Sequence, residues 1–392
     1  MGRAERESPS PGVWQRRMMS QKAAFVYGDA LSRPVLSEEH PLKSVRLRHT
    51  FDLLEAYGVF ESPDAMLVEP RAVTEEEVLR FHTRPYLECL KRISRGDHSM
   101  GPAAFGFGPG DNPIFEGMYE AAALSAGASM RAVELLLAGA VDRAFSISGG
   151  LHHAMPGSAS GFCVFNDPVL AITMLLDHGM KVAYVDIDCH HGDGVQHAFY
   201  DTDAVLTISV HESGAFLFPG TGFTHETGTG KGRGYSVNLP LYPYTGDEVY
   251  LWAFRQVAPP LLAAFAPDVI ATQLGVDSHF RDPITHLALT VQGFGQAVGE
   301  LSGAAPKWLA MGGGGYDVQA VARAWTTAYA IMLGRELPDE IPEQYRREHG
   351  VATLSDHDGP PDIDAAQADA RRFAEAGVLA LQRDVFPTHG LR

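Results

Sequence analysis

Short apolar runs alternate with longer amphipathic stretches along most of the chain. The strand-like runs cover residues 23–28, 144–148, 182–188, 205–210, 269–275 and 307–311. Helical periodicity extends over 45–57 and over the alanine-rich segment 116–137. Several strand-like runs are separated by helical stretches long enough for parallel crossovers. The pattern therefore predicts one doubly wound α/β domain, with a mostly parallel sheet covered by helices on both faces.

Both the ends of one crossover helix and the start of the domain are visible in the sequence. Asn166 or Asp167 can cap the helix, Pro168 fits its first turn, and Gly179 ends it. Residues 1–21 are rich in Arg, Ser, Pro and Met and show no periodicity, which predicts a flexible extension outside the fold.

Composition narrows the class of protein. With 392 residues and 45% hydrophobic content, the chain can bury one large core. A net charge of −17 argues against nucleic acid as a partner, because phosphate contacts require clustered Lys and Arg. Three cysteines without a C-x-x-C pair suit a reducing compartment. The sequence has no apolar run of about 20 residues and no signal-peptide core, so we expect a cytoplasmic protein without membrane contact.

Polar side chains gather where the strand-like runs end. In open α/β sheets, ligands bind beyond the carboxyl ends of the strands. The residues that follow these ends, in chain order, are His152 and His153, Asp188 and His190, Ser209 and His211, Asp277, and Tyr316 after a glycine run. One pocket could gather them all. The glycine run lacks the Lys-Ser/Thr of a phosphate-binding loop.

The densest of these segments is DIDCHHGD, residues 186–193. Strand side chains alternate, so Asp186, Asp188 and His190 project to one side. Two oxygens and an imidazole are ligands for zinc or another borderline divalent ion, and they leave a coordination position open. Asp277 would complete a mononuclear site beside Asp188 and His190. The alternatives to a metal site are a solvated loop and, for Asp277, a helix cap.

Five motifs in register resemble the histone deacetylase family. They are GGLHHAMPGSASGFCVFND (149–167), DIDCHHGDGVQHAFY (186–200), FPGTG (218–222), GVDSHFRDP (275–283) and GGGGY (312–316). The segment QLGVDSHFRDPITHLALT looks most similar to the bacterial acetoin-utilization deacetylases. The resemblance covers residues 22–340. It implies an arginase-like α/β fold and a zinc-dependent deacetylase domain over residues 22–385.

The resemblance also implies roles for single residues. The family's zinc ligands fall on Asp188, His190 and Asp277, with Fe²⁺ as another possible metal. The remaining catalytic positions are His153 as general base, His152 as its partner, Asp193 and Asp186 as the carboxylates that orient them, and Tyr316 as donor to the oxyanion.

The substrate positions follow in the same way. Phe162, which follows Gly161, and Phe218 match the aromatic walls of the family's lysine channel, although such residues are usually core. Asp111 matches the rim acid that holds the substrate backbone, with a turn cap as the alternative. Arg46 matches the arginine of an internal cavity for released acetate, with a surface helix arginine as the alternative.

The family's structural potassium sites have matching positions as well. One would use Asp186 and Ser209 with carbonyls of Asp188, His190 and Val210. A second would use the carbonyls of Phe199, Thr202, Val205 and Tyr235. The residues themselves do not indicate monovalent ions.

These expectations predict a zinc-dependent amidohydrolase that removes acetyl groups from acetyl-lysine in a protein or peptide. An acetylpolyamine amidohydrolase would share the catalytic set, but should carry an acid at the pocket mouth, where Ile284 stands. Thr285-His286-Leu287 departs from the animal lysine deacetylases at the same wall. An arginase-type ureohydrolase would need more Asp-rich loops for two manganese ions. A non-catalytic acetyl-lysine-binding scaffold predicts loss of a ligand, a tandem histidine or Tyr316. The oligomeric state stays open.

Overall fold

A computed structural model describes residues 22–33, 36–360 and 363–392, so the predicted extension 1–21 lies outside the described residues. The strands are β1 (Ala23–Val26), β2 (Ala65–Val68), β3 (Arg143–Ser146), β4 (Val182–Asp186), β5 (Val205–Glu212), β6 (Ser236–Leu241), β7 (Val269–Gln273) and β8 (Lys307–Met311). They form one sheet in the order β2-β1-β3-β8-β7-β4-β5-β6, and every neighbouring pair is parallel.

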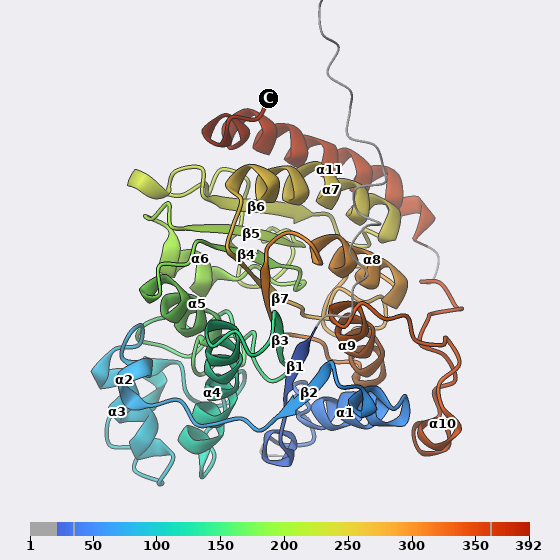
Figure 1. Cartoon of the computed structure of the whole chain (residues 1–392). Helices are drawn as coiled ribbons and strands as arrows, with labels where there is room; N and C mark the ends of the chain where they lie inside the picture. Colours follow the sequence, from blue (N-terminus) through green and yellow to red (C-terminus); the bar gives the residue numbers. More distant parts are fainter. Residues whose placement is uncertain (1–21, 34–35, 361–362) are drawn as a thin grey trace, which may run out of the picture.

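Helices cover both faces of this sheet (Figure 1). One face is covered by α1 (Val45–Ala56), α7 (Asp247–Phe265), α8 (Val291–Leu301), α9 (Val318–Met332) and α11 (Asp364–Asp384). The other face is covered by α4 (Met118–Leu137), α5 (Asp167–Asp177) and α6 (Asp193–Phe199). In β4, Ala183 and Val185 enter the first core and Val182 and Tyr184 the second. Burial on both faces explains why the strands read as continuous apolar runs.

Three further helices enlarge the domain at its margins. Helices α2 (Glu75–Val78) and α3 (Arg84–Ile93) lie beside α4 (Figure 1), where the side chains of α3 share a small core with those of α4. Helix α10 (Glu343–His349) packs Tyr345 with Leu53 of α1 and Ala322 of α9. No helix within the described ranges is long and apolar enough to cross a membrane.

The structure confirms the predicted fold class and most of the predicted elements. Asn166 caps α5, because its side chain accepts a hydrogen bond from the backbone N–H of Val169 at 3.1 Å. The runs 182–188 and 269–275 end as strands two residues early, at Asp186 and Gln273. Strands β2 and β6 were not predicted. Both lie at the edges of the sheet, where β2 is short and half-exposed and β6 contains a proline.

The sheet order places four of the strands with predicted site residues side by side. Strands β3, β8, β7 and β4 are consecutive neighbours at the centre of the sheet. Because all four are parallel, their carboxyl ends meet at one edge. The loops that leave this edge carry His152, Tyr316, Asp277 and Asp188.

Close packing of α4 against the loop between β2 and α2 gives a stability prediction. A Cβ on Gly127 would lie 1.8 Å from the carbonyl oxygen of Arg71, so Gly127→Ala must shift backbone and should lower the free energy of unfolding by about 1–3 kcal/mol. Gly299 in α8 has open space around a Cβ, so Gly299→Ala should stabilise by about 0.4–1 kcal/mol. Urea denaturation of both variants measures the difference. Equal stability of the two would contradict the packing described.

Candidate metal centre and active site

The loop after β4 is folded by its own carboxylates. Asp186 Oδ1 accepts a hydrogen bond from the backbone N–H of Asp188 at 3.1 Å, and Asp188 Oδ1 accepts one from His190 N at 2.9 Å. These short-range bonds curl the chain where it leaves the sheet. The acids and the histidine therefore stay buried at the strand end.

Asp188, His190 and Asp277 form a candidate metal site. All three are buried, and their ligand atoms lie within 4.8 Å of one another. His190 Nδ1 is 2.9 Å from Asp277 Oδ2 and 3.2 Å from Asp188 Oδ1. The structure thus brings together the three residues that the sequence nominates as ligands. One imidazole nitrogen and two carboxylate oxygens are a donor set that fits Zn²⁺ or another borderline divalent ion.

Crowding and charge around this cluster also fit a cation. A Cβ on Gly275 would lie 2.1 Å from Asp188 Oδ2, and one on Gly314 would lie 2.1 Å from Asp277 Oδ2. Glycine at both positions leaves room for the carboxylates to converge. Burial and the neighbouring Asp188 carboxylate raise the pKa of Asp277. A divalent cation would relieve this repulsion between buried acids.

The tandem histidines lie next to the cluster, and each is held by a carboxylate. His152 Nδ1 is 2.7 Å from Asp186 Oδ2, and His153 Nδ1 is 2.7 Å from Asp193 Oδ1. The two Nε2 atoms are 3.0 Å apart. The pairs His152–Asp186 and His153–Asp193 are those implied by the family resemblance. Carboxylates in such positions fix the tautomer and orientation of the imidazole.

Their surroundings separate the two histidines in basicity. Burial disfavours charge on His152, but the carboxylates of Asp186 and Asp188 outweigh it and raise the pKa of His152 to about 9. Burial and the neighbouring charge of His152 lower the pKa of His153 to about 4. The neighbouring groups therefore favour the neutral form of His153, which can accept a proton, and the protonated form of His152.

A narrow cavity of about 20 Å³ opens onto these groups, and its wall includes both histidines, Asp188, His190, Phe162 and Tyr316. One aromatic ring belongs to this wall and a second lies against His153. The ring of Phe162 is 5.8 Å from that of Tyr316, and the ring of Phe218, which is 42% exposed, is 5.0 Å from that of His153. A Cβ on Gly161 would lie 2.5 Å from His153 Cδ2, so a side chain there would collide with the histidine.

Tyr316 is held through its backbone as well as through its ring. Its N–H donates a hydrogen bond to Asp282 Oδ2 at 2.9 Å. Burial and the carboxylates of Asp277 and Asp188 raise its pKa well above the ordinary value for tyrosine. The phenol therefore remains protonated and can donate a hydrogen bond.

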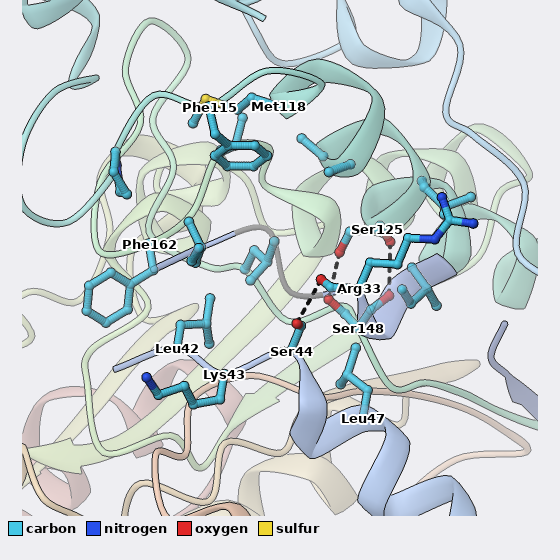
Figure 2. A pocket seen from close by; sticks show the side chains of 18 of the residues that line it. Arg33, Leu42, Lys43, Ser44, Leu47, Phe115, Met118, Ser125, Ser148 and Phe162 are labelled. Carbon is cyan, nitrogen blue, oxygen red and sulfur yellow. Dashed lines mark hydrogen bonds between the residues drawn. The ribbon is translucent and has the colours of Figure 1, made fainter. Parts of the chain in front are cut away.

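A larger cavity of about 420 Å³ adjoins the narrow one and shares Leu42, Leu151 and Phe162 with it. Figure 2 shows this cavity, with Phe162 and Leu42 at one end and Arg33 near the other. Most of its wall is apolar.

Arg46 belongs to the wall of this larger cavity. Its side chain is buried, its Nη1 donates to the Gly315 carbonyl at 3.0 Å, and its guanidinium lies 5.0 Å from the ring centre of Trp325. The alternative of a surface arginine is therefore wrong.

The two residues predicted at the rim, Asp111 and Ile284, differ in whether they line a cavity. Asp111 is exposed and lines the larger cavity, and its carbonyl is 3.2 Å from His40 Nε2. Ile284 is 36% exposed and its N–H donates to Asp282 Oδ1 at 3.1 Å. Neither cavity has Ile284 or Phe218 in its described wall.

The residues named for potassium lie near one another, but several of their oxygens have partners. Asp186 and Ser209 are register neighbours in β4 and β5, and Ser209 Oγ is 2.8 Å from His211 Nδ1. The Tyr235 carbonyl accepts from Thr207 N at 2.9 Å. Val210, Phe199, Thr202 and Val205 lie in β5 and in the chain that leads into it. Both potassium sites stay predictions.

Sequence reasoning missed three polar residues that hold the site together. Gln273 Nε2 donates to Asp188 Oδ2 at 2.6 Å, and the Tyr184 hydroxyl donates to Asp186 Oδ2 at 2.7 Å. Asp167 accepts from the backbone N–H groups of Gly150 and Leu151 at 3.0 and 2.9 Å and so fixes the loop before the tandem histidines. Polar residues inside apolar strand runs, as at Gln273 and Tyr184, are the signal that could have found the first two.

An all-parallel sheet with an Asp-His-Asp cluster at its carboxyl edge defines an arginase/deacetylase-like α/β protein. A crystal structure of a histone deacetylase homologue from Aquifex aeolicus superposes with a TM-score of 0.81 and 30% identity, covering 91% of this chain and 100% of that one. A histone deacetylase homologue complexed with SAHA gives a TM-score of 0.82 at 30% identity, covering the same shares.

Residues 40–332 match the Histone deacetylase domain, and the chain belongs to the histone deacetylase family. It is 38% identical over 354 residues to the acetoin utilization protein AcuC of Bacillus subtilis (strain 168), covering 87% of this chain and 91% of that protein. It is 37% identical over 325 residues to human histone deacetylase 1, covering 82% of this chain and 67% of that protein. The family resemblance seen in the sequence is thereby confirmed.

The donor geometry predicts metal content. We expect about one Zn²⁺ per chain after dialysis, because three protein ligands with one open position form a mononuclear site. Asp277→Asn should lower this content strongly, since an amide oxygen is a poorer ligand than a carboxylate. Elemental analysis of the purified protein measures both. Asp177→Asn, at an exposed ion pair with Arg80, is the control and should keep the full content. Equal metal in all three proteins would contradict the assignment.

Proposed function

We propose that this protein is a zinc-dependent lysine deacetylase, which hydrolyses the acetyl amide of acetyl-lysine in proteins or peptides. The observation that carries the proposal is the buried Asp188-His190-Asp277 cluster beside two buried histidines that are each held by a carboxylate. Membership of the histone deacetylase family supports the reaction type. The choice of acetyl-lysine over other acetylated amines is our proposal.

The chain's own groups divide the chemistry between them. When bound, Zn²⁺ would polarise the amide carbonyl and lower the pKa of the attacking water. His153, neutral at pH 7, takes the proton from that water as it adds to the carbonyl carbon, and delivers a proton to the amine as the C–N bond breaks. His152, as a cation held by Asp186, supports the negative charge that develops. Tyr316 donates its hydroxyl hydrogen bond to the same oxyanion.

The surroundings of the narrow cavity suit the rest of an acetyl-lysine side chain. Phe162 beside Tyr316 and Phe218 beside His153 offer apolar walls to four methylenes, which lose little on leaving water. Arg46 in the adjoining cavity offers a positive charge to released acetate. Asp111 at the exposed rim offers a carboxylate to the amide N–H groups of a peptide.

Two other functions remain as alternatives. An acetylpolyamine amidohydrolase is disfavoured because Ile284 supplies no negative charge for a second amine. A non-catalytic acetyl-lysine-binding scaffold is disfavoured because all three ligands, both tandem histidines and Tyr316 are present. Structural K⁺ at the two sets of positions named above remains part of the proposal and rests on family resemblance.

The role of Tyr316 predicts a specific kinetic change. Tyr316→Phe should lower kcat by ~10²-fold or more while KM changes little, because the phenol acts mainly on charge that appears in the transition state. Steady-state kinetics on an acetyl-lysine peptide measures both constants. As a control, Tyr57→Phe removes a hydroxyl that is bonded to the Pro338 carbonyl, remote from the site, and should leave kcat unchanged. A loss confined to KM would refute the assigned role.

The rim residues predict substrate choice. Wild type should turn over acetyl-lysine peptides faster than acetylated polyamines, because Asp111 can hold peptide amides and Ile284 is uncharged. Asp111→Ala should weaken peptide deacetylation much more than deacetylation of a small acetyl-lysine mimic without flanking amides. Glu38→Ala, another acid on the same cavity wall, should affect both substrates equally. Ile284→Glu should shift preference toward acetylpolyamines.

Comparison of kcat/KM for the two substrate classes decides between the main proposal and its first alternative. If wild type prefers an acetylpolyamine to every acetyl-lysine peptide tried, the lysine deacetylase proposal is wrong. If it hydrolyses neither class with zinc bound, the proposal that the protein is a deacetylating enzyme is wrong.

A further inference from the structure

The chain beyond residue 332 lies outside the part that matches the Histone deacetylase domain. Residues 350–360, which follow α10, nevertheless lie along the edge of the domain (Figure 1). Within this segment, the side chain of Asp356 is only 1% exposed. A carboxylate buried this deeply in a connecting segment needs compensating partners.

Asp356 has such partners on three different elements. Its Oδ1 forms an ion pair with Arg323 Nη1 of α9 at 2.8 Å. Its Oδ2 accepts from the backbone N–H of Val291, the first residue of α8, at 2.8 Å and from His279 Nε2 at 2.9 Å. The side chains of Arg323 and His279 are also buried. The carboxylate is therefore fixed in position by a charge and two further donors.

His279 connects the buried Asp356 carboxylate to the turn that contains Asp277, the proposed metal ligand. Its Nδ1 accepts from the Arg281 N–H at 3.2 Å, which leaves the ring proton on Nε2 to be donated to Asp356. The His279 N–H donates to the Val276 carbonyl at 3.0 Å, and the His279 carbonyl accepts from Asp282 N at 2.8 Å. The turn 276–282 is thus tied at both ends to one imidazole-bearing residue.

The same turn reaches the other side of the reaction centre through Asp282. The Asp282 carboxylate accepts the backbone N–H of Tyr316 at 2.9 Å. A continuous path of hydrogen bonds and short peptide segments therefore leads from Asp356 through His279 and Asp282 to Tyr316. Asp277 lies on the first turn of that path.

We propose that Asp356 is a positioning residue of the active site, acting through His279 to fix the turn that places Asp277 and Tyr316. The inference rests on the proposed function, which assigns those two residues to the metal and the oxyanion. Displacement of a catalytic group by about 1 Å can cost about 10²-fold in rate. Loss of partners that orient metal ligands usually costs about 10–100-fold in metal affinity or activity.

A purely structural role is the competing explanation, and the chain offers a matched control for it. Asp339 holds the same segment from the outside, because its carboxylate accepts from Ser355 N at 2.8 Å and pairs with His357 Nε2 at 2.9 Å. Its side chain is 43% exposed. Asp339→Asn therefore loosens the segment while it leaves every direct partner of the Asp356 carboxylate and of His279 in place.

The test compares Asp356→Asn, His279→Leu, His279→Gln and Asp339→Asn with wild type. For each, the thermal midpoint, kcat and KM on an acetyl-lysine peptide, and Zn²⁺ affinity by chelator competition are measured. Asp356→Asn and His279→Leu should each lower kcat and weaken Zn²⁺ binding by ~10-fold or more, with little change in KM. His279→Gln should stay within ~3-fold of wild type, because its amide nitrogen can replace Nε2 as donor to Asp356. Asp339→Asn should lower only the thermal midpoint.

The inference is overturned if His279→Leu keeps kcat and Zn²⁺ affinity within ~2-fold of wild type, or if Asp339→Asn loses them to the same extent. Should Asp356→Asn fail to fold, the pair His279→Leu and His279→Gln decides alone, since both keep the Asp356–Arg323 ion pair. Should wild type hydrolyse no acetyl-lysine peptide, the proposed function fails, and the Zn²⁺ competition still tests Asp356.

Discussion

The burial of three carboxylates around one point is the constraint on which the site depends. Asp186, Asp188 and Asp277 are almost completely buried, and an unpaired carboxylate in such a place costs several kcal/mol. The neighbourhood is therefore built of donors. These are the hydroxyl of Tyr184, the amide of Gln273, the imidazole of His152, and the backbone N–H groups of Cys189 and Gly314. What remains of the negative charge falls at the Asp188-His190-Asp277 cluster, where a cation can balance it.

The same arrangement gives two adjacent histidines opposite properties. His152 and His153 are adjacent in sequence but differ in their neighbours. His152 contacts the Asp186 carboxylate, whereas His153 contacts the charged ring of His152. These neighbours raise the pKa of His152, which favours its cation, and lower the pKa of His153, which favours the neutral base. Their Nε2 atoms lie 3.0 Å apart, so in the proposed mechanism a neutral base and a positive charge stand side by side. A single dipeptide supplies both, because the pKa values are set by neighbours.

Much of this could be predicted from the sequence, and the reason lies in the fold. Each central strand is a short apolar run followed at once by its polar residues, so Asp188, His190 and Asp277 were found from strand ends before any resemblance was used. The strand order was not predictable in this way, since β8 lies between β3 and β7 through contacts far apart in sequence. Asp356 was missed for the same reason, because its bond to His279 spans 77 residues and leaves no periodic signal.

The buried part of the site, its floor, and the exposed rim differ in how well they tolerate amino-acid substitution. At Gly275 and Gly314 even a methyl group would collide with the ligand carboxylates, and at Gly161 it would collide with His153. At the rim, Phe218 and Ile284 are partly exposed and can be replaced at little cost in packing. In evolutionary terms the floor can accumulate almost no variation, whereas the rim can drift. Proteins that evolve from this one would therefore change the range of substrates that they bind long before they change the bond that they break.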